Sequence, residues 1–213
     1  MVIVERPWTR GEELANSLSH FCGFLGALIG APYLLIAAMH HGGLRPILGV
    51  SVFSVTAMLL YLSSATHHWL LPGNAKNFFE VLDHAAIFLM IAGTYTPFAV
   101  GVLWGPWGWA LLGVIWPLAI LGVLLKSVRG LQSRSTTIIL YVLMGWLIVI
   151  AFHPLSVHIP ASGLRLIVGG GVAYTGGLVF YLARRIPYHH LAWHLSVLVG
   201  TTLHYFAVLR YAL

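Results

Sequence analysis

Seven apolar runs alternate with short polar segments along most of the chain. The runs lie at about residues 17–39, 46–66, 84–103, 107–126, 136–152, 164–183 and 190–209. A helix needs about 20 mainly apolar residues to cross the hydrocarbon layer of a bilayer. Among the separators, "WGPWG" is typical of a tight interfacial turn, and "KSVRGLQSRS" and "RRIPYHH" are basic loops. The pattern therefore predicts an all-α bundle of seven transmembrane helices in one domain, residues 1–213.

The composition supports this interpretation. Of the 213 residues, 59% are hydrophobic and 8% are charged, and the mean hydropathy is +0.90. A soluble domain carries about 25% charged residues, so this chain could not cover a water-facing surface. Cys22 has no second cysteine to pair with, which excludes an intrachain disulfide and a cysteine-based zinc site. The acidic residues Glu5, Glu12 and Glu13 argue against a signal peptide, so we expect the first apolar run to be retained.

The basic residues predict the orientation of the bundle. The net charge of +6 could suggest nucleic acid, but basic residues in a membrane protein mark cytoplasmic loops, so we expect membrane lipids as partners and no nucleic acid. With a cytoplasmic N-terminus, three of the eleven basic residues face outside, Arg45, Arg165 and Arg210, and eight face inside: Arg6, Arg10, Lys76, Lys126, Arg129, Arg134, Arg184 and Arg185. We therefore expect a multi-pass plasma-membrane protein with an outer C-terminus.

This orientation places many ionisable residues at one depth, near the inner ends of the helices. They are His20, His67, His68, Asp83, His84, His189, His190 and His194. His40, His41, His153 and His158 lie on the outer side, and His204 lies about 15 Å deeper than His194. Ionisable groups in a membrane are costly and usually face partners inside the bundle. Residues from the first, second, third and seventh helices are therefore expected to meet.

Two short motifs suggest a metal site. In "HLAWH", His190 and His194 stand four residues apart on one helical face, about 6 Å apart along the axis. Two such imidazoles can bind one zinc ion, although interfacial histidines bonded to water are an equally simple interpretation. "SSATHHWL" offers a third imidazole, and its spacing leaves His67 and His68 open as alternatives.

Four motifs in order resemble one family. They are E-x2–3-N-x3-H at Glu12 or Glu13, Asn16 and His20; S-x3-H at Ser63 and His67; "LDHAAIFLMIAGTYTPF" with Asp83; and H-x3-H at His190 and His194. Over nearly its whole length, the chain resembles the hemolysin III proteins, bacterial members of the progestin and adipoQ receptor superfamily. Thr66 departs from the pattern, because an aromatic residue often precedes the second-helix histidine in that family.

The resemblance implies seven transmembrane helices with a cytoplasmic N-terminus and a zinc ion (Zn2+) near the inner face. By resemblance, His67, His190 and His194 would bind the zinc, and Asp83 would reach it through water. The superfamily is similar to alkaline ceramidases, which hydrolyse lipid amides, and its bacterial members have been linked to haemolysis and to membrane homeostasis.

These residues suggest a zinc-dependent hydrolase of a lipid-like amide or ester. Three neutral histidines leave a coordination position open, as in catalytic zinc sites. Asp83 is then the expected proton acceptor, and Ser63 is expected to stabilise charge or to support a ligand. A non-enzymatic membrane sensor with a structural zinc stays an alternative. A b-type haem is disfavoured because the inner histidines crowd near helix ends, and direct lysis does not suit a seven-helix chain.

Overall fold

The computed structural model describes residues 7–128 and 134–213. Within them the chain is helical without strands, and seven helical segments are long and apolar enough to cross a membrane. The elements are α1 (Arg10–His41), α2 (Leu44–Trp69), α3 (Asn74–Val100), α4 (Pro106–Ser127), α5 (Arg134–Trp146), the 3-10 helix η1 (Leu147–Ala151), α6 (Phe152–His158), α7 (Ala161–Leu182) and α8 (His189–Tyr211). The expected all-α, seven-helix fold is confirmed.

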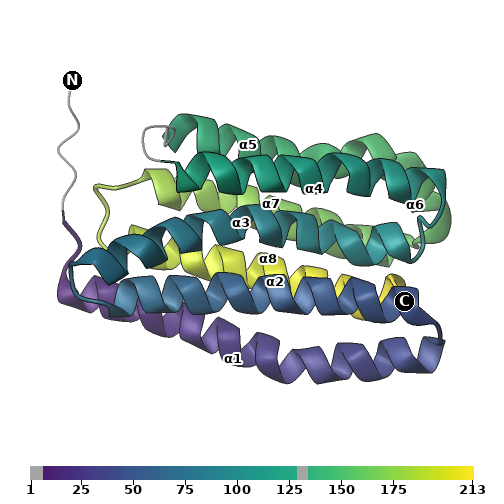
Figure 1. Cartoon of the computed structure of the whole chain (residues 1–213), viewed down its shortest axis with the longest axis horizontal. Helices are drawn as coiled ribbons and strands as arrows, with labels where there is room; N and C mark the ends of the chain where they lie inside the picture. The colour runs from purple at the N-terminus through teal and green to yellow at the C-terminus, as the bar shows by residue number, and fades with distance from the viewer. Residues whose placement is uncertain (1–6, 129–133) are drawn as a thin grey trace.

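The helices lie side by side along the long axis of the molecule (Figure 1). Each of α1 to α4 packs against the next, α5 packs against α3, α4 and α7, and α7 packs against α8. Because α1 also packs against α8, the first and last helices are brought together. This closure places the polar ends of α1, α2, α3 and α8 at the same end of the bundle.

α1 begins at Arg10, before the apolar run predicted from residue 17. Thr9 caps it: the Thr9 side chain accepts a hydrogen bond from Glu12 N, and the Glu12 carboxylate accepts one from Thr9 N. This capping box satisfies backbone donors that the start of a helix leaves free. The first turns of α1 therefore carry polar residues ahead of the apolar run.

α3 also starts earlier than its apolar run predicts. It begins at Asn74, whereas the hydropathy pattern placed its start at residue 84. Asp83 and His84 were expected to begin this helix, and the structure places them more than two turns inside it. The physical reason is that "NAKNFFEVL" is too polar to count as a membrane span but still forms a helix.

The fifth span, Arg134–His158, is one helical segment whose α-helical geometry is interrupted. Between α5 and α6 the backbone tightens into the 3-10 helix η1. The Tyr95 hydroxyl of α3 lies 2.7 Å from the carbonyl oxygen of Met144 and 2.9 Å from that of Gly145, and it accepts a hydrogen bond from Ile148 N at 2.9 Å. Backbone groups in a membrane must find partners inside the protein, so Tyr95 stabilises this break.

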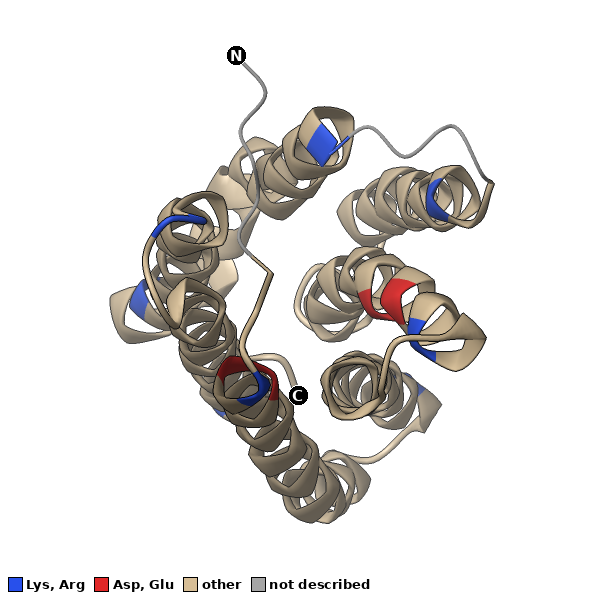
Figure 2. Ribbon diagram, turned by 90° about the vertical axis from the view of Figure 1, so that its left-hand side faces the viewer, with Lys and Arg blue, Asp and Glu red and all other residues tan. Residues whose placement is uncertain are grey.

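Charged residues gather at the end of the bundle where the described chain starts (Figure 2). The helix ends on this side carry Arg10, Lys76, Lys126, Arg134 and Arg184. Arg6 and Arg129, also counted in the orientation argument, lie outside the described residues. The asymmetry favours a cytoplasmic position for this end, and the orientation stays a prediction.

Candidate metal centre

Three histidines from two helices meet near the polar end of the bundle. They are His68 near the end of α2 and His190 and His194 in the first turns of α8. One possible ligand atom from each lies within 4.8 Å of the other two. The ring centroids are 5.0 Å apart for His68 and His190, and 4.5 Å apart for His190 and His194. We call these three residues the histidine cluster.

A carboxylate from α1 fixes the ring of His68. His68 Nδ1 donates a hydrogen bond to Glu13 Oε2 at 2.6 Å, and Lys76 Nζ donates to Glu13 Oε1 at 2.9 Å. Within the described chain, His68 Nε2 is buried and has no hydrogen-bond partner. Glu13 therefore sets the tautomer that turns the lone pair of Nε2 toward the cluster, as carboxylates do behind histidine ligands of metals.

α1 fixes His194 in a similar way. His194 Nδ1 donates to the backbone carbonyl of Asn16 at 3.1 Å, and Ser19 Oγ lies 3.0 Å from the same nitrogen. The ring of His20 stacks on that of His194 with a centroid distance of 3.5 Å. The polar motif near the start of the chain therefore packs behind the cluster and orients it.

The structure differs from the resemblance in α2, where His68 and not His67 joins the cluster. Successive residues on a helix are turned by about 100°, so the two rings point in different directions. His67 Nδ1 lies 3.3 Å from the carbonyl oxygen of Lys76 and turns toward the start of α3.

Ser63, the serine predicted together with His67, is also not directed to the cluster by a hydrogen bond. Ser63 Oγ donates to the carbonyl of Leu60 at 3.0 Å, so this hydroxyl is used within its own helix. Ser64, one turn before His68, lines the cavity described next together with Asp83. The S-x3-H motif occurs twice, one residue apart, and in the structure it is the second pair, Ser64 and His68, whose histidine belongs to the cluster.

Two cavities meet at the histidine cluster. A mainly apolar cavity of about 150 Å³ runs among α3, α5, α7 and α8, and His190 and His194 line it near one end. A more polar cavity of about 360 Å³ lies on the charged side and is lined by His68, His190 and Lys76. Asp83 lines both cavities. Its carboxylate is not part of the group of ligand atoms that lie within 4.8 Å of one another, so its role at a metal stays a prediction.

The donor set fits a zinc ion. Three buried imidazoles offer nitrogen ligands that zinc prefers, and fewer than four protein ligands are typical of catalytic rather than structural zinc. A buried nitrogen without a partner, such as His68 Nε2, costs about 1–3 kcal/mol unless something binds it.

Comparison with known proteins decides the family. The model of the family described as "Haemolysin-III related" matches residues 8–205. The chain belongs to this family. It is 41% identical to Hemolysin-3 of Bacillus cereus over 207 residues, covering 95% of this chain and 92% of that protein. It is 38% identical to the Hemolysin-3 homolog of Bacillus subtilis (strain 168) over 204 residues, covering 96% of each.

A more distant relative extends the relationship. The human monocyte to macrophage differentiation factor is 23% identical over 210 residues, covering 94% of this chain and 84% of that protein. This similarity agrees with the resemblance to the progestin and adipoQ receptor superfamily. The haemolysin-III match begins at Trp8, so it includes the start of the chain that packs behind the cluster.

Trp8 and Glu12 complete the site of this haemolysin-III family member. The centroid of the Trp8 ring lies 5.2 Å from that of the His68 ring and 4.7 Å from that of the His190 ring. Glu12 Oε1 accepts a hydrogen bond from Tyr188 N at 2.9 Å, just before α8 begins. Sequence reasoning missed both roles: Trp8 belongs to no spacing motif, and the motif that includes Glu12 or Glu13 does not reveal the contact with Tyr188.

Proposed function

We propose that this protein is a zinc-dependent membrane hydrolase of a lipid amide or ester, with His68, His190 and His194 as the metal ligands. The observation that carries the proposal is the position of the histidine cluster between an apolar cavity and a polar one. An acyl chain suits the apolar cavity, and water and a polar headgroup suit the other. The scissile bond then lies beside the cluster.

The residues of the chain have distinct tasks in this reaction. A zinc ion at the cluster supplies a Lewis acid that polarises a carbonyl and makes water more acidic. Asp83 takes a proton from the water that adds to the acyl carbon. As the bond from the acyl carbon to nitrogen or oxygen breaks, Asp83 returns the proton to the leaving group. The products are a carboxylic acid and an amine or an alcohol.

Metal analysis of detergent-purified protein tests the ligands. We expect about one zinc per chain in the wild type and its loss in His68→Ala, His190→Ala and His194→Ala. His67→Ala is the matched control, because His67 is a buried histidine next to His68 but outside the cluster. If His67→Ala loses the metal and His68→Ala keeps it, the proposed ligand set is wrong.

Turnover separates the enzyme from the alternative in which zinc only holds α2 against α8. We expect purified protein to release fatty acid from a labelled ceramide or from a matched acyl ester. Asp83→Asn should keep its zinc and lose at least 100-fold in rate, because general acid–base catalysis contributes about 10²–10⁴. Full zinc without turnover in the wild type, on either substrate, would favour the structural role.

A further inference from the structure

His204 stands apart from the proposed catalytic residues. It is ten residues beyond His194 on α8, about 15 Å further along the helix axis. Its side chain is 8% exposed, and in the described chain its Nδ1 is buried without a hydrogen-bond partner. A polar group at this depth in a membrane is costly and is usually kept for a function.

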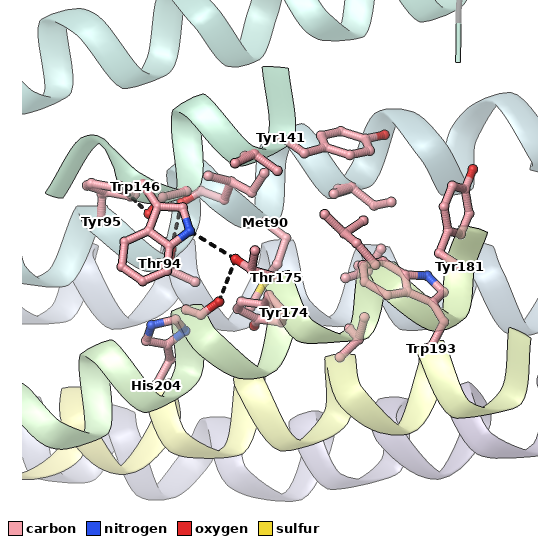
Figure 3. Close-up of a pocket in the computed structure, with 18 of the residues that line it drawn as sticks. Met90, Thr94, Tyr95, Tyr141, Trp146, Tyr174, Thr175, Tyr181, Trp193 and His204 are labelled. Atoms are coloured by element: carbon pink, nitrogen blue, oxygen red, sulfur yellow. Dashed lines mark hydrogen bonds between the residues drawn. The ribbon is translucent and has the colours of Figure 1, made fainter. Parts of the chain in front are cut away.

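The polar neighbours of His204 are paired with one another. Tyr174, whose ring is 5.5 Å from that of His204, shares a hydrogen bond of 2.8 Å with Thr201 Oγ1. Trp146 Nε1 donates to Thr175 Oγ1, which donates to the carbonyl of Gly171 (Figure 3). These groups form their hydrogen bonds within the protein. Among the described residues, the backbone of Ile167 interacts with the His204 ring, and His204 Nδ1 has no hydrogen-bond partner.

The backbone of α7 makes room for this imidazole. A Cβ atom on Gly170 would lie 2.8–3.0 Å from three atoms of the His204 ring, which is closer than such contacts normally come. Glycine at this position therefore lets the ring fit between α7 and α8. The site is built to hold an imidazole where an aliphatic side chain would avoid the cost of a buried polar atom.

His204 lines the same cavity as His190 and His194, two members of the histidine cluster. In Figure 3 it lies at one end of the labelled residues, with Trp193 and Tyr181 at the other. His190 and His194 line the cavity near that second end, one turn or less from Trp193 along α8. Apolar side chains such as Met90, Ile87 and Val197 line the wall as well. The cavity is therefore apolar along its length with a polar group toward each end.

We propose that His204 binds a hydroxyl or carbonyl group carried on the acyl chain of the ligand, far from the bond that reacts. A neutral imidazole can donate or accept a hydrogen bond, and a neutral partner avoids the cost of burying a charge. An extended chain advances about 1.2 Å per bond, so 15 Å corresponds to about twelve bonds. The inference rests on the proposed function in one respect only: the carboxyl group of the ligand is taken to bind at the histidine cluster.

Fatty acids, the expected product class, test this binding directly. The probes are dodecanoic acid and ω-hydroxydodecanoic acid, with the decanoic and tetradecanoic pairs to bracket the length. Dissociation constants are measured by calorimetry on purified protein in nanodiscs, for the wild type and for His204→Leu. For each protein we take the ratio of the dissociation constants of the plain acid and the ω-hydroxy acid. At one chain length we expect this ratio to be about fivefold larger in the wild type than in His204→Leu, as the loss of one ordinary hydrogen bond predicts.

Two further variants make the result specific. His204→Gln keeps a neutral donor and acceptor and should retain the preference for the hydroxyl. His158→Leu removes an exposed histidine at the end of α6, away from the cavity, and should behave as the wild type. If His204→Leu does not fold, Gly170→Ala is used in its place, since its new methyl group displaces the ring.

The outcomes separate this inference from the proposed function. The inference is overturned if the hydroxyl changes the affinity equally in the wild type and in the folded His204→Leu or Gly170→Ala variant at every chain length. This holds even if zinc and turnover are present. A preference that depends on His204 would support it even if the purified protein lacks zinc. Zinc content is measured on the same samples, and it should be unchanged in His204→Leu.

Discussion

Glu13 and Asn16 show how residues outside the histidine cluster control it. Glu13 accepts from His68 Nδ1 and is itself bound by Lys76, while the Asn16 carbonyl accepts from His194 Nδ1. Each contact holds one ring nitrogen as a donor and leaves Nε2 as the atom available to a metal. These two α1 residues therefore act on the proposed zinc through the histidines that they hold.

Removing the charge of Glu13 should weaken zinc binding. In Glu13→Gln the amide is a poorer acceptor for His68 Nδ1 and no longer forms an ion pair with Lys76. We expect the dissociation constant for zinc to rise by about 10-fold to 100-fold, the usual effect of losing such a supporting contact. Competition against a zinc chelator measures it.

Glu80→Gln is the control for that measurement. Glu80 is an exposed acid on the wall of the same polar cavity, and it is not part of the histidine cluster. Its zinc affinity should stay within about twofold of the wild type. Equal affinities of Glu13→Gln and the wild type would show that Glu13 does not orient His68.

Among the helices, α7 and α8 approach each other closely at several glycines, and Gly177 is the one nearest to the histidine cluster. A Cβ atom on Gly177 would lie 2.6 Å from Ser196 Cβ and 2.9 Å from Trp193 Cε3. Small residues allow this kind of close helix packing in a membrane. Because α8 carries His190 and His194, the approach at Gly177 also sets the position of the histidine cluster.

Gly177→Ala should destabilise the bundle. The added methyl group overlaps the side chains of α8, and overpacking of this kind costs about 1–3 kcal/mol. For a chain of this length that corresponds to a fall of about 2–12 °C in the unfolding midpoint, measured in detergent.

Gly176 offers a matched control in the next position. A Cβ atom there would meet nothing within 4 Å, so Gly176→Ala should leave the midpoint unchanged or raise it slightly, since alanine is the better helix former. Equal midpoints for Gly176→Ala and Gly177→Ala would contradict the packing described for α7 and α8.

The charge asymmetry predicts the orientation of the whole bundle, and labelling can test it. Cys22 is replaced by serine, and single cysteines are introduced as Arg185→Cys and His158→Cys, both at exposed positions. We expect an impermeant maleimide to label His158→Cys in intact cells and Arg185→Cys only after the membrane is opened. The reverse pattern would place the histidine cluster on the outer side.

Much of this architecture can be predicted from the amino-acid sequence. The apolar runs are long enough that only membrane-spanning helices satisfy their backbone groups, so the number and order of spans needed no tertiary information. His190 and His194 were also predictable as neighbours, because four residues on a helix return to the same face. Helix starts were less predictable, because the first turns of α1 and α3 are polar and lie ahead of the apolar runs that hydropathy detects.

The choice between His67 and His68 depended on tertiary packing. Both have a serine four residues earlier, and a rotation of α2 by about 100° exchanges them. The packing of α1 settles the rotation, since Glu13 holds His68 and Ser17 Oγ donates to the carbonyl of Ala65 at 2.8 Å. With His68 in the cluster, His67 stands where an aromatic residue is common in the family.

Local pattern thus fixes what depends on one helix: its span, its faces and its pairs of residues. Which face of α2 meets α8, which serine reaches the cavity with Asp83, and how Trp8 packs on the histidine rings depend on contacts between segments far apart in the chain. Spacing motifs do not encode those contacts, because each is the outcome of packing all the helices at once.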